Sequence, residues 1–183
     1  MVESLGKDGY VRENGKLQAV PIAHKTLDVP FDNDRKTHVM AIPWGDVSTA
    51  FYTTEIPNIE TFTGVPKSGV MFARMGNYLG WLLRNTSVQK FIRNSVSKSL
   101  TGPDENIQNN AQTRVWGKVT NAKGQSAEAR IFSIEAYTLT ALMALNITKK
   151  VLEGNFKIGY QTPASAYGQD LIMELEGTRR EDI

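Results

Sequence analysis

The chain has 183 residues, of which 40% are hydrophobic and 22% are charged; this composition is typical of a folded globular protein and excludes disordered, collagen-like and coiled-coil chains. It has no cysteine, and this excludes a disulfide framework and a thiolate nucleophile. Because it has only two histidines, His24 and His38, we expect no bound metal. The 21 Lys and Arg residues are scattered and nearly balance 19 Asp and Glu residues, so we expect no nucleic-acid partner.

The length predicts one domain, spanning residues 1–183. Met1 to Ser4 lack the basic and apolar regions of a secretory signal, so we expect a cytoplasmic protein. Val2–Leu5 followed by Gly6 has the pattern of the last turn of a helix. Two interpretations remain open at this point: a longer chain upstream, or a frayed terminus.

The first elements are predicted to be strands. Asn14-Gly15 lies between Tyr10–Arg12 and Leu17–Val20, and this pair of residues favours a tight hairpin. Two more strands are predicted over His24–Phe31 and Lys36–Ile42.

A short helix is predicted over Val47–Thr54, with Asp46 able to accept hydrogen bonds from its first amides, and a strand over Asn58–Val65. Ser68–Leu83 follows as a helix with more apolar residues than one buried stripe needs. It either packs inside the domain or forms a self-association face, and its 16 residues fall short of the ~20 that span a bilayer. A helix over Val88–Leu100 and a polar loop over Asp104–Gln112 are expected next.

The last third of the chain predicts a second hairpin and two helices. Gln112–Val119 and Gln125–Ser133 pair around a turn, with Val115, Gly117 and Val119 facing Ala127, Ala129 and Ile131, and with Trp116, Lys118, Glu128 and Arg130 on the other face. Glu135–Glu153 is the clearest helix and is expected to be the spine of the core. Pro163–Leu175 is predicted as a helix with Thr162 as its N-cap.

Two familiar nucleotide motifs are missing from the sequence. No two glycines have the GxG spacing and no GxxxxGK loop is present, so we expect no cofactor to bind to this chain alone. Two segments could carry chemistry. Trp44–Phe51 opens a helix with Gly45, Asp46, Ser48 and Thr49, where Asp46 is either the cap or a ligand contact and Trp44 is either a core residue or a stacking surface. In Gly159–Gly168, aromatic residues lie on both sides of the start of a helix that begins at Pro163. This segment is either a contact site or simply a helix cap with aromatic residues on the surface.

These segments carry a resemblance to a known family. Trp44–Ala50, Ile56–Glu60, Tyr137–Ala141 and Gln161-Thr162-Pro163 with Tyr167-Gly168 resemble, in order and spacing, the C-terminal half of saccharopine dehydrogenase-like NAD(P)-dependent oxidoreductases. The resemblance covers nearly the whole chain, to about Gly177.

The resemblance implies an α+β domain with a mixed, largely antiparallel sheet covered by helices, which lacks the Rossmann half. That half would bind NAD or NADP, and this domain would contact a small-molecule substrate and form a homodimer. The implied substrate-cleft residues are Trp44, Gly45, Asp46, Ser48, Thr49 and Tyr137. The implied contacts to the cofactor domain are Gln161, Thr162, Pro163 and Tyr167. No residue matches a position to which a catalytic role can be assigned, and the isolated chain is expected to be inactive.

Overall fold

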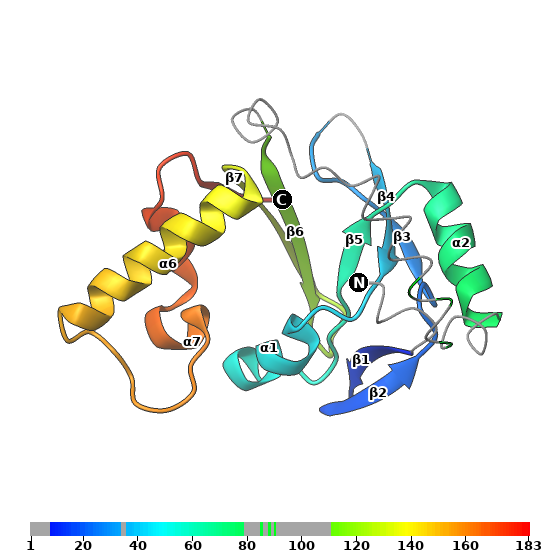
Figure 1. The fold of residues 1–183 in the computed structure, drawn as a ribbon, viewed down its shortest axis with the longest axis horizontal. Helices are drawn as coiled ribbons and strands as arrows, with labels where there is room; N and C mark the ends of the chain where they lie inside the picture. The colour runs from blue at the N-terminus through cyan, green and yellow to red at the C-terminus, as the bar shows by residue number, and fades with distance from the viewer. Residues whose placement is uncertain (1–7, 34–35, 79–84, 86–87, 89, 91–110) are drawn as a thin grey trace. The chain divides into compact units, whose positions relative to one another are not determined.

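The computed structural model describes residues 8–33, 36–78, 85, 88, 90 and 111–183 (Figure 1). The chain divides into two compact units, Met1–Gly102 and Pro103–Ile183, and each is described here by itself. The described strands form three antiparallel sheets accompanied by helices, which confirms the α+β class. We expected a single mixed sheet, but among the described residues each set of strands pairs mainly with its own neighbours in sequence.

The first unit begins with the predicted hairpin. β1 (Gly9–Glu13) pairs with β2 (Lys16–Val20) around Asn14 and Gly15. Both turn residues have positive φ, 50° and 76°, which the two-residue hairpin turn requires. The hairpin prediction is therefore confirmed.

The second sheet has the order β3 (Thr26–Val29), β4 (Thr37–Ala41) and β5 (Phe62–Gly64). Val29, Val39 and Ala41 of this sheet are buried and supply much of the core of the unit. The strand expected over Asn58–Val65 is shorter than predicted, because Ile59 forms an isolated bridge with Arg12 of the hairpin before β5 joins β4.

Two helices complete the described part of this unit. α1 (Asp46–Thr54) buries Val47, and α2 (Lys67–Tyr78) buries Val70. α2 covers the described part of the helix expected over Ser68–Leu83. The remainder of that helix, the turn expected at Val2–Leu5 and most of the predicted helix 88–100 and loop 104–112 lie outside the described residues.

The second unit is built on the predicted second hairpin. β6 (Thr113–Thr120) and β7 (Ser126–Ser133) pair with Val115 opposite Ile131, Gly117 opposite Ala129 and Val119 opposite Ala127. This is the predicted register. β8 (Arg179–Asp182), which the sequence did not predict, adds a third strand beside β7.

α6 (Ala136–Leu152) confirms the clearest predicted helix, with the Glu135 side chain capping its first turn. No residue of α6 is buried, so its expected role as the spine of the core is wrong. The helix expected over Pro163–Leu175 is two elements, α7 (Pro163–Tyr167) and the 3-10 helix η2 (Gln169–Glu174). Gly168 separates them with a φ of 89°, a conformation that interrupts a helix.

The cap of α6 gives a pH-dependent prediction. The carboxylate of Glu135 accepts hydrogen bonds from the backbone amides of Tyr137 (2.9 Å) and Thr138 (3.0 Å), and these bonds lower the pKa of Glu135 below its ordinary 4.5. A lowered pKa in the folded state stabilises the protein above the ordinary pKa, and that contribution is lost as the pH falls through the folded value. Glu135→Gln should therefore make thermal stability less dependent on pH between pH 3 and 6. An identical pH slope in both proteins would contradict this role of the cap.

Candidate functional site

The Trp44 turn, residues 44–49, leads into α1, with Trp44, Asp46 and Ser48 exposed and Val47 buried. Trp44 is 54% exposed, so the interpretation of Trp44 as a core residue is wrong. Gly45 is the N-cap and provides no side-chain hydrogen bond, and Asp46 is the first helical residue. The interpretation of Asp46 as the cap is therefore also wrong, because the helix begins one residue earlier than expected.

The turn keeps its shape through its own backbone. The amides of Ser48 and Thr49 donate to the carbonyl of Gly45 at 2.9 and 3.2 Å, and Thr49 Oγ1 donates to the same carbonyl at 3.3 Å. A Cβ added at Gly45 would meet no atom within 4 Å. The space in front of the turn within this unit is therefore open.

The side chain of Arg12 in β1 binds backbone carbonyls of this turn. Its Nε donates to the Val47 carbonyl at 3.0 Å, and its Nη2 donates to the Ser48 carbonyl at 3.0 Å. Nη1 donates to the carbonyl of Gly15 in the hairpin turn at 2.7 Å, and the guanidinium lies 4.5 Å from the centroid of the Phe51 ring. Arg12 is only 6% exposed, so a buried cation joins the hairpin to the first turn of α1.

Sequence reasoning did not identify Arg12. A single arginine in a hairpin strand is ordinarily a solvent-exposed residue, and two of the three carbonyls that Arg12 binds lie 35 and 36 residues further along the chain. The local pattern contained no signal for this contact.

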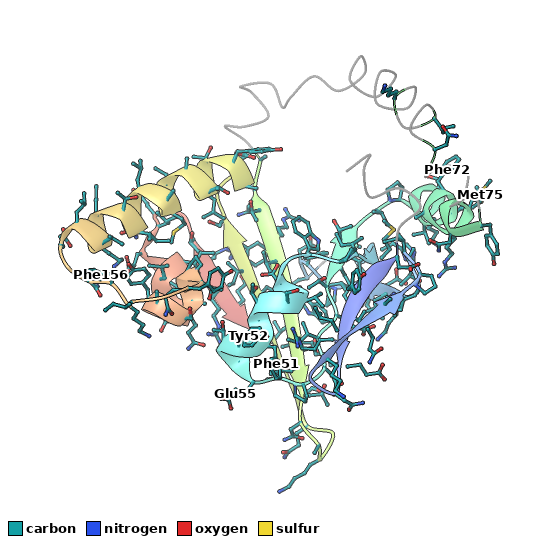
Figure 2. All side chains as sticks on the ribbon, turned by 60° about the horizontal axis from the view of Figure 1, so that its bottom comes forward. Phe51, Tyr52, Glu55, Phe72, Met75 and Phe156 are labelled. Carbon is teal, nitrogen blue, oxygen red and sulfur yellow. The ribbon has the colours of Figure 1, made fainter. Side chains whose placement is uncertain are left out.

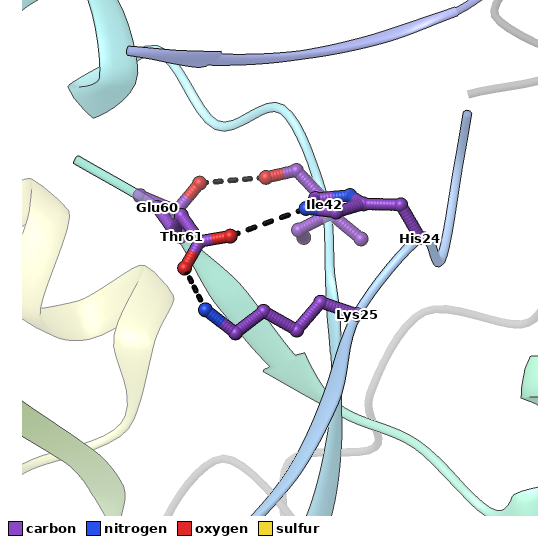
Figure 3. A network of polar contacts seen from close by, with 5 residues as sticks. All are labelled: His24, Lys25, Ile42, Glu60 and Thr61. Atoms are coloured by element: carbon purple, nitrogen blue, oxygen red, sulfur yellow. Dashed lines mark hydrogen bonds and ion pairs between the residues drawn. The ribbon is translucent and has the colours of Figure 1, made fainter. Parts of the chain in front are cut away.

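A second set of contacts holds the other side of the Trp44 turn (Figure 3). Thr61 Oγ1 donates to the Ile42 carbonyl at 2.6 Å, as Figure 3 shows, and it accepts from the Trp44 amide at 3.3 Å. The neighbouring Glu60 carboxylate binds Lys25 Nζ, and its Oε1 lies 3.2 Å from His24 Nε2. Residues 60 and 61 therefore tie the start of β3 and the Trp44 turn to the segment before β5.

The pKa of Glu60 reports this pairing. Partial burial acts to raise the pKa, but the hydrogen bonds from Lys25 and His24 outweigh it and hold the pKa below its ordinary 4.5. The carboxylate of Glu60 therefore remains ionised near neutral pH, and its charge is stabilised by the hydrogen bonds from Lys25 and His24.

The other histidine is also paired with a carboxylate. His38 Nδ1 lies 2.9 Å from Asp28 Oδ1, and the hydrogen bond from His38 lowers the pKa of Asp28. Such a bond orients an imidazole, as in general-base dyads, but the Asp28 side chain is 63% exposed, and the pair resembles a surface ion pair. No group of three or more metal-ligating side chains occurs in the part of the chain that the structure describes.

A crevice of the first unit lies next to this network. It is lined by residues of β1, β2, the following loop and β4, including Tyr10, Pro21, His24 and Pro43, and it has no room for a water molecule. The Trp44 turn has exposed side chains available for contact, whereas this crevice has no room for a ligand.

In the second unit, the four predicted interdomain residues lie together around the start of α7. Thr162 caps α7 through a reciprocal pair of hydrogen bonds with Ser165, and Pro163 occupies the first turn. Gln161 Oε1 accepts from Ser165 Oγ at 3.0 Å. Tyr167 donates from its hydroxyl to the Asn155 carbonyl at 3.0 Å, which fixes α7 beside the segment that follows α6.

Tyr137, the remaining cleft candidate, is the second residue of α6 and is 71% exposed. Lys150, near the other end of that helix, lies 5.8 Å from the Tyr167 ring. Thirteen residues of helix separate Tyr137 from Lys150, about 20 Å at 1.5 Å per residue. The structure therefore does not bring Tyr137 together with Gln161–Tyr167.

The chain matches no family model and no curated protein. None of the described helices is both long enough and apolar enough to cross a membrane.

Arg12→Met should destabilise the first unit by about 3 kcal/mol, because three charge-assisted hydrogen bonds are lost from a buried position. Native-state hydrogen exchange of the β1 and α1 amides measures the loss. Arg74→Met is the matched control: Arg74 donates one side-chain hydrogen bond, to the Ala23 carbonyl at 3.1 Å, and its replacement should cost about 1 kcal/mol. Equal losses for the two variants would contradict the special role of Arg12.

Thr61→Val should loosen the Trp44 turn without a large change of volume, because it removes the hydroxyl that bonds both Ile42 and Trp44. We expect faster exchange at the Trp44 amide and a loss of about 1 kcal/mol in stability. Thr63→Val is the control, since the Thr63 hydroxyl makes no hydrogen bond to any described residue. If both variants left the exchange rate of Trp44 unchanged, Thr61 would not hold the turn.

Proposed function

We propose that this chain is the substrate-binding and dimerisation domain of a saccharopine dehydrogenase-like NAD(P)-dependent oxidoreductase in the cytoplasm. In this proposal the nicotinamide cofactor, NAD or NADP, binds a nucleotide-binding domain in the same or a separate chain. This chain supplies contacts to a small-molecule substrate, and the hydride chemistry belongs to the cofactor.

The observation that carries the proposal is the exposed Trp44 on a turn held by a buried arginine. The exposed part of the Trp44 side chain offers a large aromatic surface with one N–H donor for contact with a ligand or another protein. The turn also coincides with Trp44–Ala50, the first of the segments that resemble the family. Its fixed backbone would present the same side chains in every copy, as a binding surface requires.

In this proposal each side chain of the turn makes a different contact with the substrate. The Trp44 indole would pack against an apolar part of the substrate, and the hydroxyls of Ser48 and Thr49 would hydrogen-bond its polar groups. Asp46 is exposed and in the first turn of α1, so its carboxylate would accept hydrogen bonds from donor groups.

The contact to the cofactor domain would use the start of α7. The reciprocal bonds between Thr162 and Ser165 fix the direction in which Pro163 and Gln161 face, and Tyr167 is anchored through its hydroxyl. A preformed cap of this kind lowers the entropic cost of docking.

The cofactor assignment is tested by titrating the isolated chain with NADH and with NADPH and following nucleotide fluorescence. We expect no binding of either nucleotide by this chain, because its sequence holds neither familiar phosphate-binding motif. A dehydrogenase with a complete nucleotide-binding domain is the positive control. Micromolar affinity for the isolated chain would overturn the proposed division between domains.

A second candidate function is a stand-alone self-association module, and the orientation of α2 favours it. Met71, Phe72, Met75 and Tyr78 are 57%, 67%, 48% and 85% exposed, and Figure 2 labels Phe72 and Met75 on this helix. Arg74 and Asn77 instead turn inward and donate to the carbonyls of Ala23 (3.1 Å) and Ile22 (2.9 Å).

α2 buries Val70 but leaves its larger apolar side chains exposed, whereas a surface helix usually turns its apolar side toward the core. Met71, Met75 and Tyr78 are spaced as a helix–helix seam. These three side chains carry no charge. The same three residues of a second copy would therefore pack against them across a two-fold axis.

Phe72→Asp tests this face by placing a charge in the stripe. If a second copy covers α2, the dissociation constant of the dimer should rise at least tenfold in sedimentation equilibrium. Tyr52→Asp is the control, because Tyr52 is an exposed aromatic on α1 (80%, against 67% for Phe72), and its replacement should leave association unchanged. A dimer that survives Phe72→Asp with unchanged affinity would exclude the α2 face as its interface.

A further inference from the structure

We draw no further inference here: the strongest candidate outside the surfaces already assigned, the uncharged outer face of α6 formed by Tyr137, Ala141, Leu145 and Leu152, is exposed, but nothing in the structure shows what covers it.

Discussion

The guanidinium of Arg12 is the contact on which the candidate site of the first unit depends. A buried cation must have acceptors for its N–H groups, and here the acceptors are three backbone carbonyls, of Gly15, Val47 and Ser48. The Phe51 ring covers the guanidinium plane. Because these acceptors belong to the hairpin turn and to the start of α1, one side chain fixes two elements that are distant in sequence. The backbone of the Trp44 turn is therefore held at Val47 and Ser48 by a residue of the hairpin.

Among the described helices, the two longest, α2 and α6, both expose large apolar side chains. On α2 the polar residues are used for inward hydrogen bonds. On α6 the inner face is held partly by polar contacts, because Asn146 and Lys150 both bind the carboxylate of Glu174. Large exposed apolar surfaces mark places where another protein surface binds. The two helices are therefore consistent with the proposal of a domain that works with a partner.

The sequence predicted which segments form the candidate site, but it did not predict how their side chains are arranged. Residue types and order pointed to Trp44–Phe51 and Gly159–Gly168, and the resemblance to a family was noted on these segments afterwards. The structure places the start of a helix in each of them. Thr162 was correctly predicted as a cap, since a Thr-Pro pair is a local signal. The assignments of Asp46 and Trp44 as cap and core were wrong, because they depended on where the helix begins and on what packs against it.

Local sequence determined the two hairpins, the register of β6 with β7, and α6, because turn residues, strand alternation and helical periodicity act over a few neighbouring residues. Tertiary structure alone decided the burial of Arg12 and the exposure of α6. It also decided the pairing of β8, a run of four charged residues with no strand pattern, which lies beside β7 with Glu181 opposite Arg130. Such features depend on acceptors, partners and surfaces far along the chain, and no local pattern encodes them.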